Sequence, residues 1–409
     1  MKRILMITAL ILVLTMLPVA LFSCNAPEET EGPTETSTET ETEKPKETEA
    51  PLEGTEYSLL ENIDKIKING RYTKTRLGIA CDNLGSGIEF NGVMKGKVYL
   101  EVLNVLVNGQ TKGAYYTVYI DGERQEERLM AKMGRRSTIL TLADFGETEA
   151  EHHIRVVKQT EARYARAEFI SITMDGQFKD APKDRDLLIE FVGSDLICGM
   201  GNYNGTPDQE PAVAQTAEYE DGTQSISFIV AEALNADCSI LGVSGMGVAG
   251  TWMPPVTAPL YYKYNSYYRD NNAEYDFANG RKADLIVLNI GKNDGNIPVE
   301  NRPTDEVFIQ TAKEYLQFLK EKHGDEVKII WTYDISDDDP ETLDKDETND
   351  CRYKIVEEIL EELGGEEAGL YICQVYTNRL GGQKHTDMAG HKTSAEGLLA
   401  FIEEKGILG

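Results

Sequence analysis

The chain has 409 residues, of which 41% are hydrophobic, and a formal net charge of −29 at pH 7. This length is sufficient for two ordinary domains, each with a hydrophobic core of its own. The acidic balance argues against nucleic-acid binding, because contacts to phosphates need clustered lysines and arginines and the sequence has no such cluster.

The first 24 residues have the layout of a secretory signal peptide. Lys2 and Arg3 precede an apolar run that extends to Phe22, and Leu21-Phe22-Ser23-Cys24 is similar to the lipobox of bacterial lipoproteins. We therefore expect an exported protein that faces outside and is held at the cell surface by a lipid on Cys24. An uncleaved membrane anchor is the alternative, because the apolar run approaches the about 20 residues that span a bilayer.

Residues 25–56 consist mainly of Glu, Thr and Pro, with eleven Glu, two Lys and no aromatic residue. Such a segment cannot bury a core, and repulsion between its carboxylates favours an extended chain. We expect a disordered acidic tether between the membrane and the folded part of the protein.

Short β-prone runs with regular spacing follow over residues 57–180, with turn residues such as Asp121-Gly122 between them. This pattern is typical of an antiparallel sandwich, and we predict an all-β jelly-roll domain. The expected strands are Ile66–Ile68, Gly87–Phe90, Lys97–Val102, Tyr115–Ile120, Ser137–Leu142, His153–Val157 and Glu168–Ile172.

A short polar linker leads into residues 187–409, where strand-like runs alternate with helical ones. Alternation at this spacing predicts an α/β domain with a parallel sheet and helices on both faces. The expected strands are Leu187–Val192, Ser239–Val243, Ala283–Ile290, Val327–Thr332 and Leu370–Gln374. The expected helices are Ser225–Leu234, Glu306–Lys322, Tyr353–Leu363 and Thr393–Lys405.

Four polar stretches of this second domain are suited to acyl transfer, which needs a nucleophile, a base and donors for the developing oxyanion. Three of them follow predicted strands, at whose carboxyl ends open α/β sheets bind ligands, and the fourth precedes the last predicted helix. They are Gly193-Ser194-Asp195, Val243-Ser244-Gly245-Met246-Gly247, Gly291-Lys292-Asn293-Asp294 and Lys384-His385-Thr386.

These blocks resemble the SGNH or GDSL hydrolases, and most of all the two-domain carbohydrate esterases of family 2. The N-terminal part of the resemblance rests on Gly70-Arg71-Tyr72, Gly85–Phe90, Val118–Gly122 and His153 with Lys158–Glu161. The resemblance covers most of residues 57–409. It implies a jelly-roll domain followed by a flavodoxin-like, three-layer SGNH domain. The implied activity is removal of acetyl groups from a polysaccharide or oligosaccharide through an acyl-enzyme, without a metal or an organic cofactor.

The resemblance also implies roles for single residues. Gly245 and Asn293 correspond to the oxyanion donors and His385 to the general base, a role that suits a neutral imidazole near pH 7. His391 stands at the second histidine that the family commonly retains. The family aspartate two residues before the catalytic histidine is Gln383 here, so a main-chain carbonyl would have to orient His385.

The order Gly193-Ser194-Asp195 departs from the family's Gly-Asp-Ser, so Asp195 stands at the position of the nucleophile. Adjacent side chains at a strand end point to opposite sides, so Ser194 replaces that nucleophile only if the turn shifts by one residue. Three hypotheses remain open: Ser194 acts in a shifted turn, Asp195 takes part in catalysis by orienting water with His385, or hydrolysis is lost and a sugar-binding cleft is retained. The expected function is deacetylation of a polysaccharide, and the alternative is a catalytically impaired, carbohydrate-binding surface lipoprotein.

Other features have simpler interpretations. Five scattered cysteines (Cys81, Cys198, Cys238, Cys351 and Cys373) indicate buried thiols rather than disulfides or a metal site. Trp252 and the tyrosine-rich stretch Leu260–Tyr268 suit either sugar stacking or core packing. We expect His323 at the surface, and the acidic runs Asp337–Asp339 and Asp344–Asp346 to be solvated rather than bound to calcium.

Overall fold

The computed structural model describes residues 52–105, 113–211, 216–252, 256–266, 274–336 and 352–409. The predicted signal peptide with Cys24 and most of the acidic tether lie outside these residues, as do Cys351 and both acidic runs. Within the described chain, none of the helices combines the length and apolar character that a membrane span requires.

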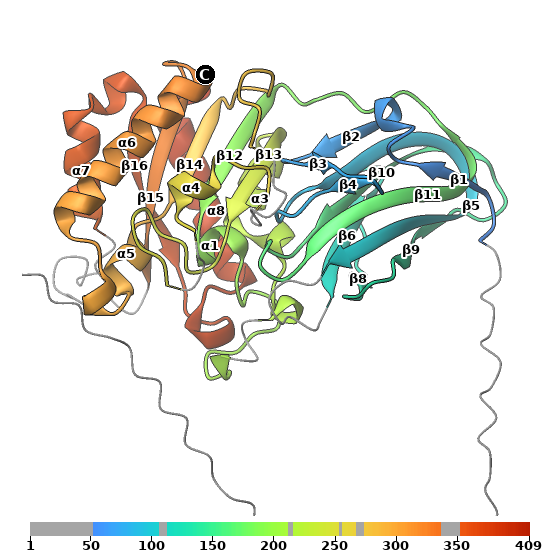
Figure 1. Ribbon diagram of the computed structural model, residues 1–409, viewed down its shortest axis with the longest axis horizontal. Helices are drawn as coiled ribbons and strands as arrows, with labels where there is room; N and C mark the ends of the chain where they lie inside the picture. The colour runs from blue at the N-terminus through green and yellow to red at the C-terminus, as the bar shows by residue number, and fades with distance from the viewer. Residues whose placement is uncertain (1–51, 106–112, 212–215, 253–255, 267–273, 337–351) are drawn as a thin grey trace, which may run out of the picture. The chain divides into compact units, whose positions relative to one another are not determined.

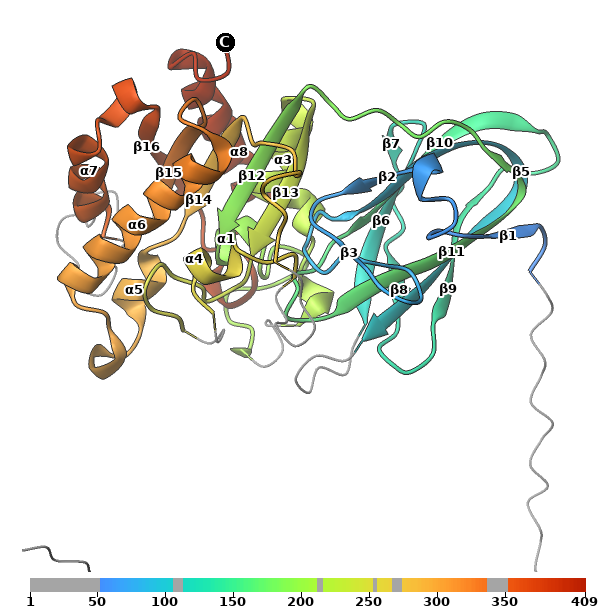
Figure 2. The ribbon, with the colours of Figure 1, turned by 45° about the horizontal axis from the view of Figure 1, so that its top comes forward.

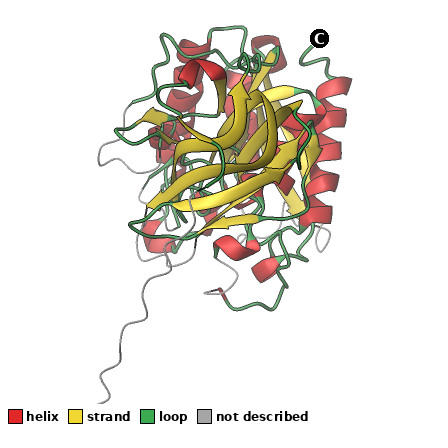
Figure 3. Ribbon diagram, turned by 90° about the vertical axis from the view of Figure 1, so that its right-hand side faces the viewer, coloured by secondary structure: helices red, strands yellow, loops and turns green. Residues whose placement is uncertain are grey.

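An antiparallel sheet of eleven strands occupies the described residues between 55 and 178, and Figure 3 shows its long strands curving across the view. The strand order is β3-β4-β11-β5-β10-β6-β7, while β1, β2, β8 and β9 pair with β11, β5, β6 and β5. The bounds are β1 Thr55–Ser58, β2 Ile66–Asn69, β3 Thr73–Lys74, β4 Ile79–Ala80, β5 Gly87–Val105, β6 Ala114–Ile120, β7 Glu123–Arg124, β8 Leu129–Ala131, β9 Thr138–Asp144, β10 Ala150–Lys158 and β11 Arg166–Phe178. The predicted antiparallel sheet is therefore confirmed, while the jelly-roll connectivity stays a prediction.

One expectation about this sheet was wrong. The runs Gly87–Phe90 and Lys97–Val102 are not two strands but parts of the single long strand β5. The residues between them continue to pair, with Met94 opposite both Ala150 of β10 and Gly176 of β11. Polar and glycine residues in this stretch resemble a turn in the sequence, but the partner strands on both sides hold it extended.

A second sheet has five parallel strands in the order β13-β12-β14-β15-β16 (Figure 1). Its strands are β12 Leu187–Gly193, β13 Ala236–Gly242, β14 Leu285–Asn289, β15 Lys328–Ser336 and β16 Leu370–Thr377. The near-continuous apolar runs of β12 and β14 fit this position, because a parallel sheet is covered on both faces. Each of these strands was predicted within a few residues.

Helices cover both faces of the parallel sheet, as predicted (Figure 2). Side chains of α4, α6 and α7 share one core with the sheet, and those of α1, α3 and α8 share the other. The helices are α1 Asp195–Cys198, α3 Ile226–Ala233, α4 Ala258–Tyr261, α5 Lys292–Asn296, α6 Asp305–His323, α7 Tyr353–Glu362 and α8 Met388–Glu404. The longest two begin at side-chain caps: Thr304 accepts from the N–H of Val307, and Asp387 from that of Gly390.

His323 is buried, which corrects the expectation that it lies at the surface. Its Nδ1 accepts the N–H of Ala283 at 3.0 Å, and its Nε2 lies 2.7 Å from the hydroxyl of Tyr262. Burial lowers the pKa of His323 below its ordinary value. The imidazole at the end of α6 thus bonds to its neighbours instead of to water.

Buried ion pairs join the two sheets. Lys67 of β2 contacts Asp237 of β13 at 2.5 Å, and Arg71 contacts Glu190 of β12 at 3.2 Å. Arg71 also lies over the rings of Tyr262 and Tyr275, 4.4 and 4.0 Å from their centroids. Glu190 interrupts an otherwise apolar strand, and Arg71 supplies the charge that its burial requires.

Candidate functional site

The four polar stretches of the second domain meet at the carboxyl edge of the parallel sheet. Ser194 follows β12, Gly245 lies beyond β13, Asn293 is the second residue of α5 after β14, and His385 precedes α8. Ser194, Asn293 and His385 line a cleft of about 400 Å³, and Gly245 lines an adjoining hollow that also includes His385. The tertiary fold therefore brings together residues that are up to 191 positions apart.

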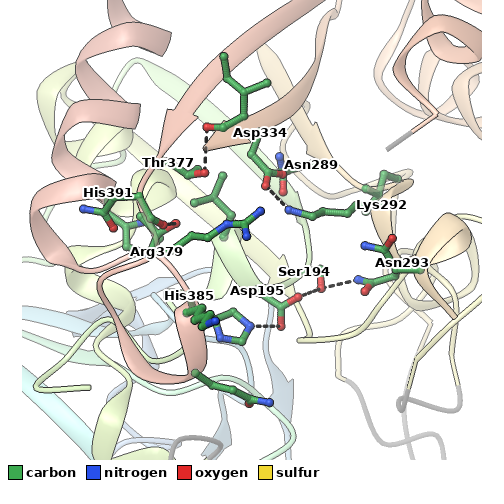
Figure 4. A pocket seen from close by; sticks show the side chains of 18 residues that line it. Ser194, Asp195, Asn289, Lys292, Asn293, Asp334, Thr377, Arg379, His385 and His391 are labelled. Carbon is green, nitrogen blue, oxygen red and sulfur yellow. Dashed lines mark hydrogen bonds and ion pairs between the residues drawn. The ribbon is translucent and has the colours of Figure 1, made fainter. Parts of the chain in front are cut away.

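The hydroxyl of Ser194 lies where the predicted oxyanion donors converge. The Gly245 N–H and the Asn293 side-chain amide each donate to Ser194 Oγ at 2.8 Å. Ser194 Oγ in turn donates to Asp195 Oδ2 at 2.8 Å (Figure 4). The serine oxygen therefore uses both donors that a substrate carbonyl would need.

Asp195, not Ser194, faces the candidate base. Asp195 Oδ1 lies 3.8 Å from His385 Nε2. The turn is not shifted, since Gly193 keeps its register with Gly242 on one side and Asn289 on the other, and Asp195 opens α1. The hypothesis of a shifted turn with Ser194 as nucleophile is wrong for this geometry.

His385 is oriented by the main chain. Its Nδ1 lies 2.9 Å from the carbonyl oxygen of Gly382. A carbonyl only accepts hydrogen bonds, so Nδ1 carries the proton and Nε2 is directed toward Asp195. The preceding residues Gln383 and Lys384 both have positive φ, at 54° and 61°, which folds the chain tightly enough for this contact.

Asp294 fixes the loop beyond Gly245, a function that the sequence did not indicate. Its carboxylate accepts the N–H groups of Val248, Ala249 and Gly250 at 2.7–2.8 Å. Burial raises the pKa of Asp294, and the three N–H donors oppose the shift. A Cβ atom at Gly247 would lie 2.4 Å from Asp294 Oδ2, so only glycine fits there.

The N-terminal sheet domain also reaches this site, through Glu161. Its Oε2 accepts the N–H of Ser244 at 2.7 Å, next to the Gly245 donor, and its Oε1 pairs with Arg163 at 2.8 Å. Arg163 lines the hollow that contains Gly245. In the sequence, Glu161 stands out only through the resemblance, because nothing in the local pattern connects it to Ser244.

Trp252 and the tyrosines occupy different environments. Trp252 is 53% exposed and lines the hollow together with Asp195 and His385. Tyr261 and Tyr262 are buried in the core instead. Sugar stacking therefore stays a hypothesis for Trp252, whereas Tyr261 and Tyr262 pack in the core.

His391 also lines the cleft. It is buried, and burial lowers the pKa of His391 to about 3, so the ring is neutral at pH 7. Its Nδ1 accepts the N–H of Ile226 at 3.3 Å.

In the described part of the chain, no three or more acidic, histidine or cysteine side chains are grouped to hold a metal ion. The four described cysteines are buried free thiols, as expected.

This chain is similar to known proteins in sequence and in fold. A family model described as the N-terminal domain of carbohydrate esterase 2 matches residues 70–182. The cellulase/esterase CelE of Acetivibrio thermocellus is 29% identical over 153 residues, which are 36% of this chain and 18% of CelE. This chain is related to the carbohydrate esterases of family 2. The matched segment thus spans less than a fifth of that curated relative.

Solved family 2 structures share the fold. The family 2 esterase of Clostridium thermocellum, in complex with cellohexaose, has a TM-score of 0.70 at 22% identity, over 84% of this chain and 100% of that chain. The acetyl xylan esterase Est2A of the rumen bacterium Butyrivibrio proteoclasticus has a TM-score of 0.71 at 22% identity, over 87% and 99%. The N-terminal sheet domain and the parallel-sheet domain thus share their fold with these structures.

Proposed function

We propose that this chain is a carbohydrate esterase-like protein that binds polysaccharide in its cleft and does not hydrolyse esters through an acyl-serine. The arrangement of Ser194 supports this proposal. Its hydroxyl accepts from Gly245 and Asn293 and donates to Asp195, while the Asp195 carboxylate faces His385.

The hydrogen bonds of Ser194 oppose hydrolysis through an acyl-serine. A serine nucleophile needs a base within hydrogen-bonding reach of its hydroxyl, but the hydroxyl proton of Ser194 is directed to Asp195. One oxyanion donor is worth about 2.7–4 kcal/mol of transition-state stabilisation, and here both side-chain and main-chain donors are engaged by Ser194 Oγ. An ester carbonyl would have to displace that oxygen first.

The features that favour glycan binding are separate from the nucleophile. The cleft is lined mainly by polar side chains, and Trp252 offers an exposed aromatic face beside it. The related esterase of Clostridium thermocellum is solved in complex with cellohexaose. On this proposal the chain is an exported lipoprotein, attached through Cys24 and carried on its acidic tether, with a jelly-roll first domain.

The native chain is expected to hydrolyse 4-nitrophenyl acetate at the same background rate as the His385→Ala variant. Because no hydroxyl is directed at His385, removal of its imidazole should leave the hydrolysis rate unchanged. Initial rates at pH 7, measured spectrophotometrically with equal protein concentrations, check this. A native rate about tenfold or more above that of His385→Ala contradicts the proposal, since it is the size of effect that a working general base provides.

A second candidate function is deacetylation by a water molecule that Asp195 and His385 orient together. The 3.8 Å approach of Asp195 Oδ1 to His385 Nε2, and the Gly382 carbonyl behind the ring, favour it. Here the native chain hydrolyses the ester, and both Asp195→Asn and His385→Ala abolish the activity. The same rate assay therefore separates the two functions.

Trp252→Ala is expected to weaken binding of cellohexaose about fivefold, because stacking on an aromatic face contributes about 1 kcal/mol. Isothermal titration calorimetry measures the change, and Trp252→Phe is expected to retain most of the affinity. Tyr72→Ala is the matched control, since Tyr72 is an exposed aromatic residue of the first domain that does not line the cleft. Equal affinity of the native chain and Trp252→Ala would place the glycan elsewhere.

A further inference from the structure

The cleft has an unusual charge distribution for so acidic a chain. Three cationic side chains line it, those of Lys292, Arg379 and Lys384, against the two carboxylates of Asp195 and Asp334. The chain as a whole has a net charge of −29. The positive side chains of the cleft therefore reflect a requirement of this site and not the average composition of the chain.

Both carboxylates of the cleft already have partners. Lys292 Nζ lies 2.5 Å from Asp334 Oδ2. Burial by itself would raise the pKa of Asp334, but Lys292 and the hydrogen bonds to the carboxylate outweigh burial, and the pKa lies below its ordinary value. Asp334 therefore stays ionised. Asp195 accepts from Ser194 and faces His385. Neither carboxylate is therefore available to neutralise a further cation.

Of the three cleft cations, Lys292 is paired with Asp334, which leaves Arg379 and Lys384 among the described residues. The side chain of Arg379 extends into the cleft between the Lys292–Asp334 pair and the Asp195–His385 pair (Figure 4). Within the described chain, no hydrogen bond, ion pair or ring contact joins its guanidinium to another residue. Lys384 lines the same cleft, directly before His385. An extended arginine that contacts no other described residue in this way is positioned to meet a ligand, because its fixed fork of N–H donors pairs with a planar anion.

We propose that Arg379, supported by Lys384, binds the carboxylate of a uronic acid, so that the glycan for this cleft is acidic. This inference rests on the proposed function, since it names the class of polysaccharide that the cleft takes. A carboxylate matches the guanidinium with two parallel hydrogen bonds, which a neutral sugar hydroxyl cannot do.

The position of Arg379 fits a chain-like ligand. The cleft with Arg379 and the hollow with Trp252 share Asp195 and His385 as lining residues. A glycan that crosses these shared residues can place one sugar against Trp252 and another, charged sugar near Arg379. The two contacts are therefore independent and can be tested separately.

The test compares a xylo-oligosaccharide that carries one glucuronic acid branch with the unbranched oligosaccharide of the same length. Calorimetry with the native chain at low salt is expected to show about tenfold tighter binding of the acidic probe. That advantage should shrink with added salt, because the contact is exposed to solvent. Arg379→Gln should remove the advantage and leave binding of the unbranched probe unchanged, while Arg379→Lys restores part of it.

Matched controls make the result specific. Arg76→Gln makes the same charge change at an exposed arginine of the first domain and should leave both affinities unchanged. Thermal unfolding of each variant shows whether the fold is intact.

Three outcomes overturn the inference. They are equal native affinity for the two probes, loss of both affinities in Arg379→Gln, and equal binding of a sulfated oligosaccharide, which would show a response to charge alone. If the native chain binds the unbranched probe without preference, only this inference fails. If it binds neither probe, the proposed glycan binding fails as well.

Discussion

Exchanging the two central residues, Ser194→Asp with Asp195→Ser, is expected to raise the rate of 4-nitrophenyl acetate hydrolysis at least about 100-fold above that of the native chain. The exchange places a hydroxyl at the start of α1, on the side that faces His385 Nε2, and removes the carboxylate now there. It also restores the order Gly-Asp-Ser that the resemblance to family 2 implies. Steady-state kinetics and a burst of 4-nitrophenol in rapid mixing measure the gain and the acyl-enzyme.

Two further variants define the cause of that gain. Adding His385→Ala to the exchanged protein should return the rate to background, because the new hydroxyl then has no base. Asp195→Ser alone should give a smaller gain, since Ser194 Oγ still takes the hydrogen bonds of Gly245 and Asn293. If the exchanged protein stays folded and shows no gain, the remaining site is not competent, and the esterase resemblance extends to the fold only.

Arg71→Met is expected to lower the free energy of unfolding by about 3–5 kcal/mol, the largest stability effect that we expect of a single substitution. Glu190 and Arg71 are each nearly inaccessible to solvent, and the substitution leaves the Glu190 carboxylate buried without its cation. The loss includes the contacts of Arg71 with the Tyr262 and Tyr275 rings. Urea denaturation monitored by circular dichroism measures the change.

The control for this prediction is an exposed ion pair. Lys313 and Glu362 lie 2.5 Å apart with side chains 26% and 65% exposed, and Lys313→Met should cost less than about 1 kcal/mol. Combining Arg71→Met with Glu190→Gln should recover part of the loss, because the buried charge is then removed. If Arg71→Met costs no more than Lys313→Met, the buried pair does not hold the two sheets together.

The sequence determined the course of most strands and helices. The apolar runs that form β12 and β14, the helical spacing of α6 and α7 and the polar residues at the strand ends are local patterns, and such patterns follow from burial periodicity. The polar residues that directly follow the predicted strands also indicated the candidate site, because the carboxyl ends of parallel strands share one edge. For β5 the local signal failed, since pairing with β10 and β11 overrides a weak, turn-like stretch.

Only the tertiary structure decided what the site residues do to one another. That Ser194 Oγ takes the hydrogen bonds of Gly245 and Asn293, and that Asp195 turns to His385, depends on the directions of side chains from segments far apart in the chain. The burial of His323 and the position of Arg379 in the cleft likewise depend on which segments pack around them. Periodicity specifies which face of an element is buried, but hydrogen bonds and charge pairs depend on positions of single atoms, and those are set only when distant segments meet.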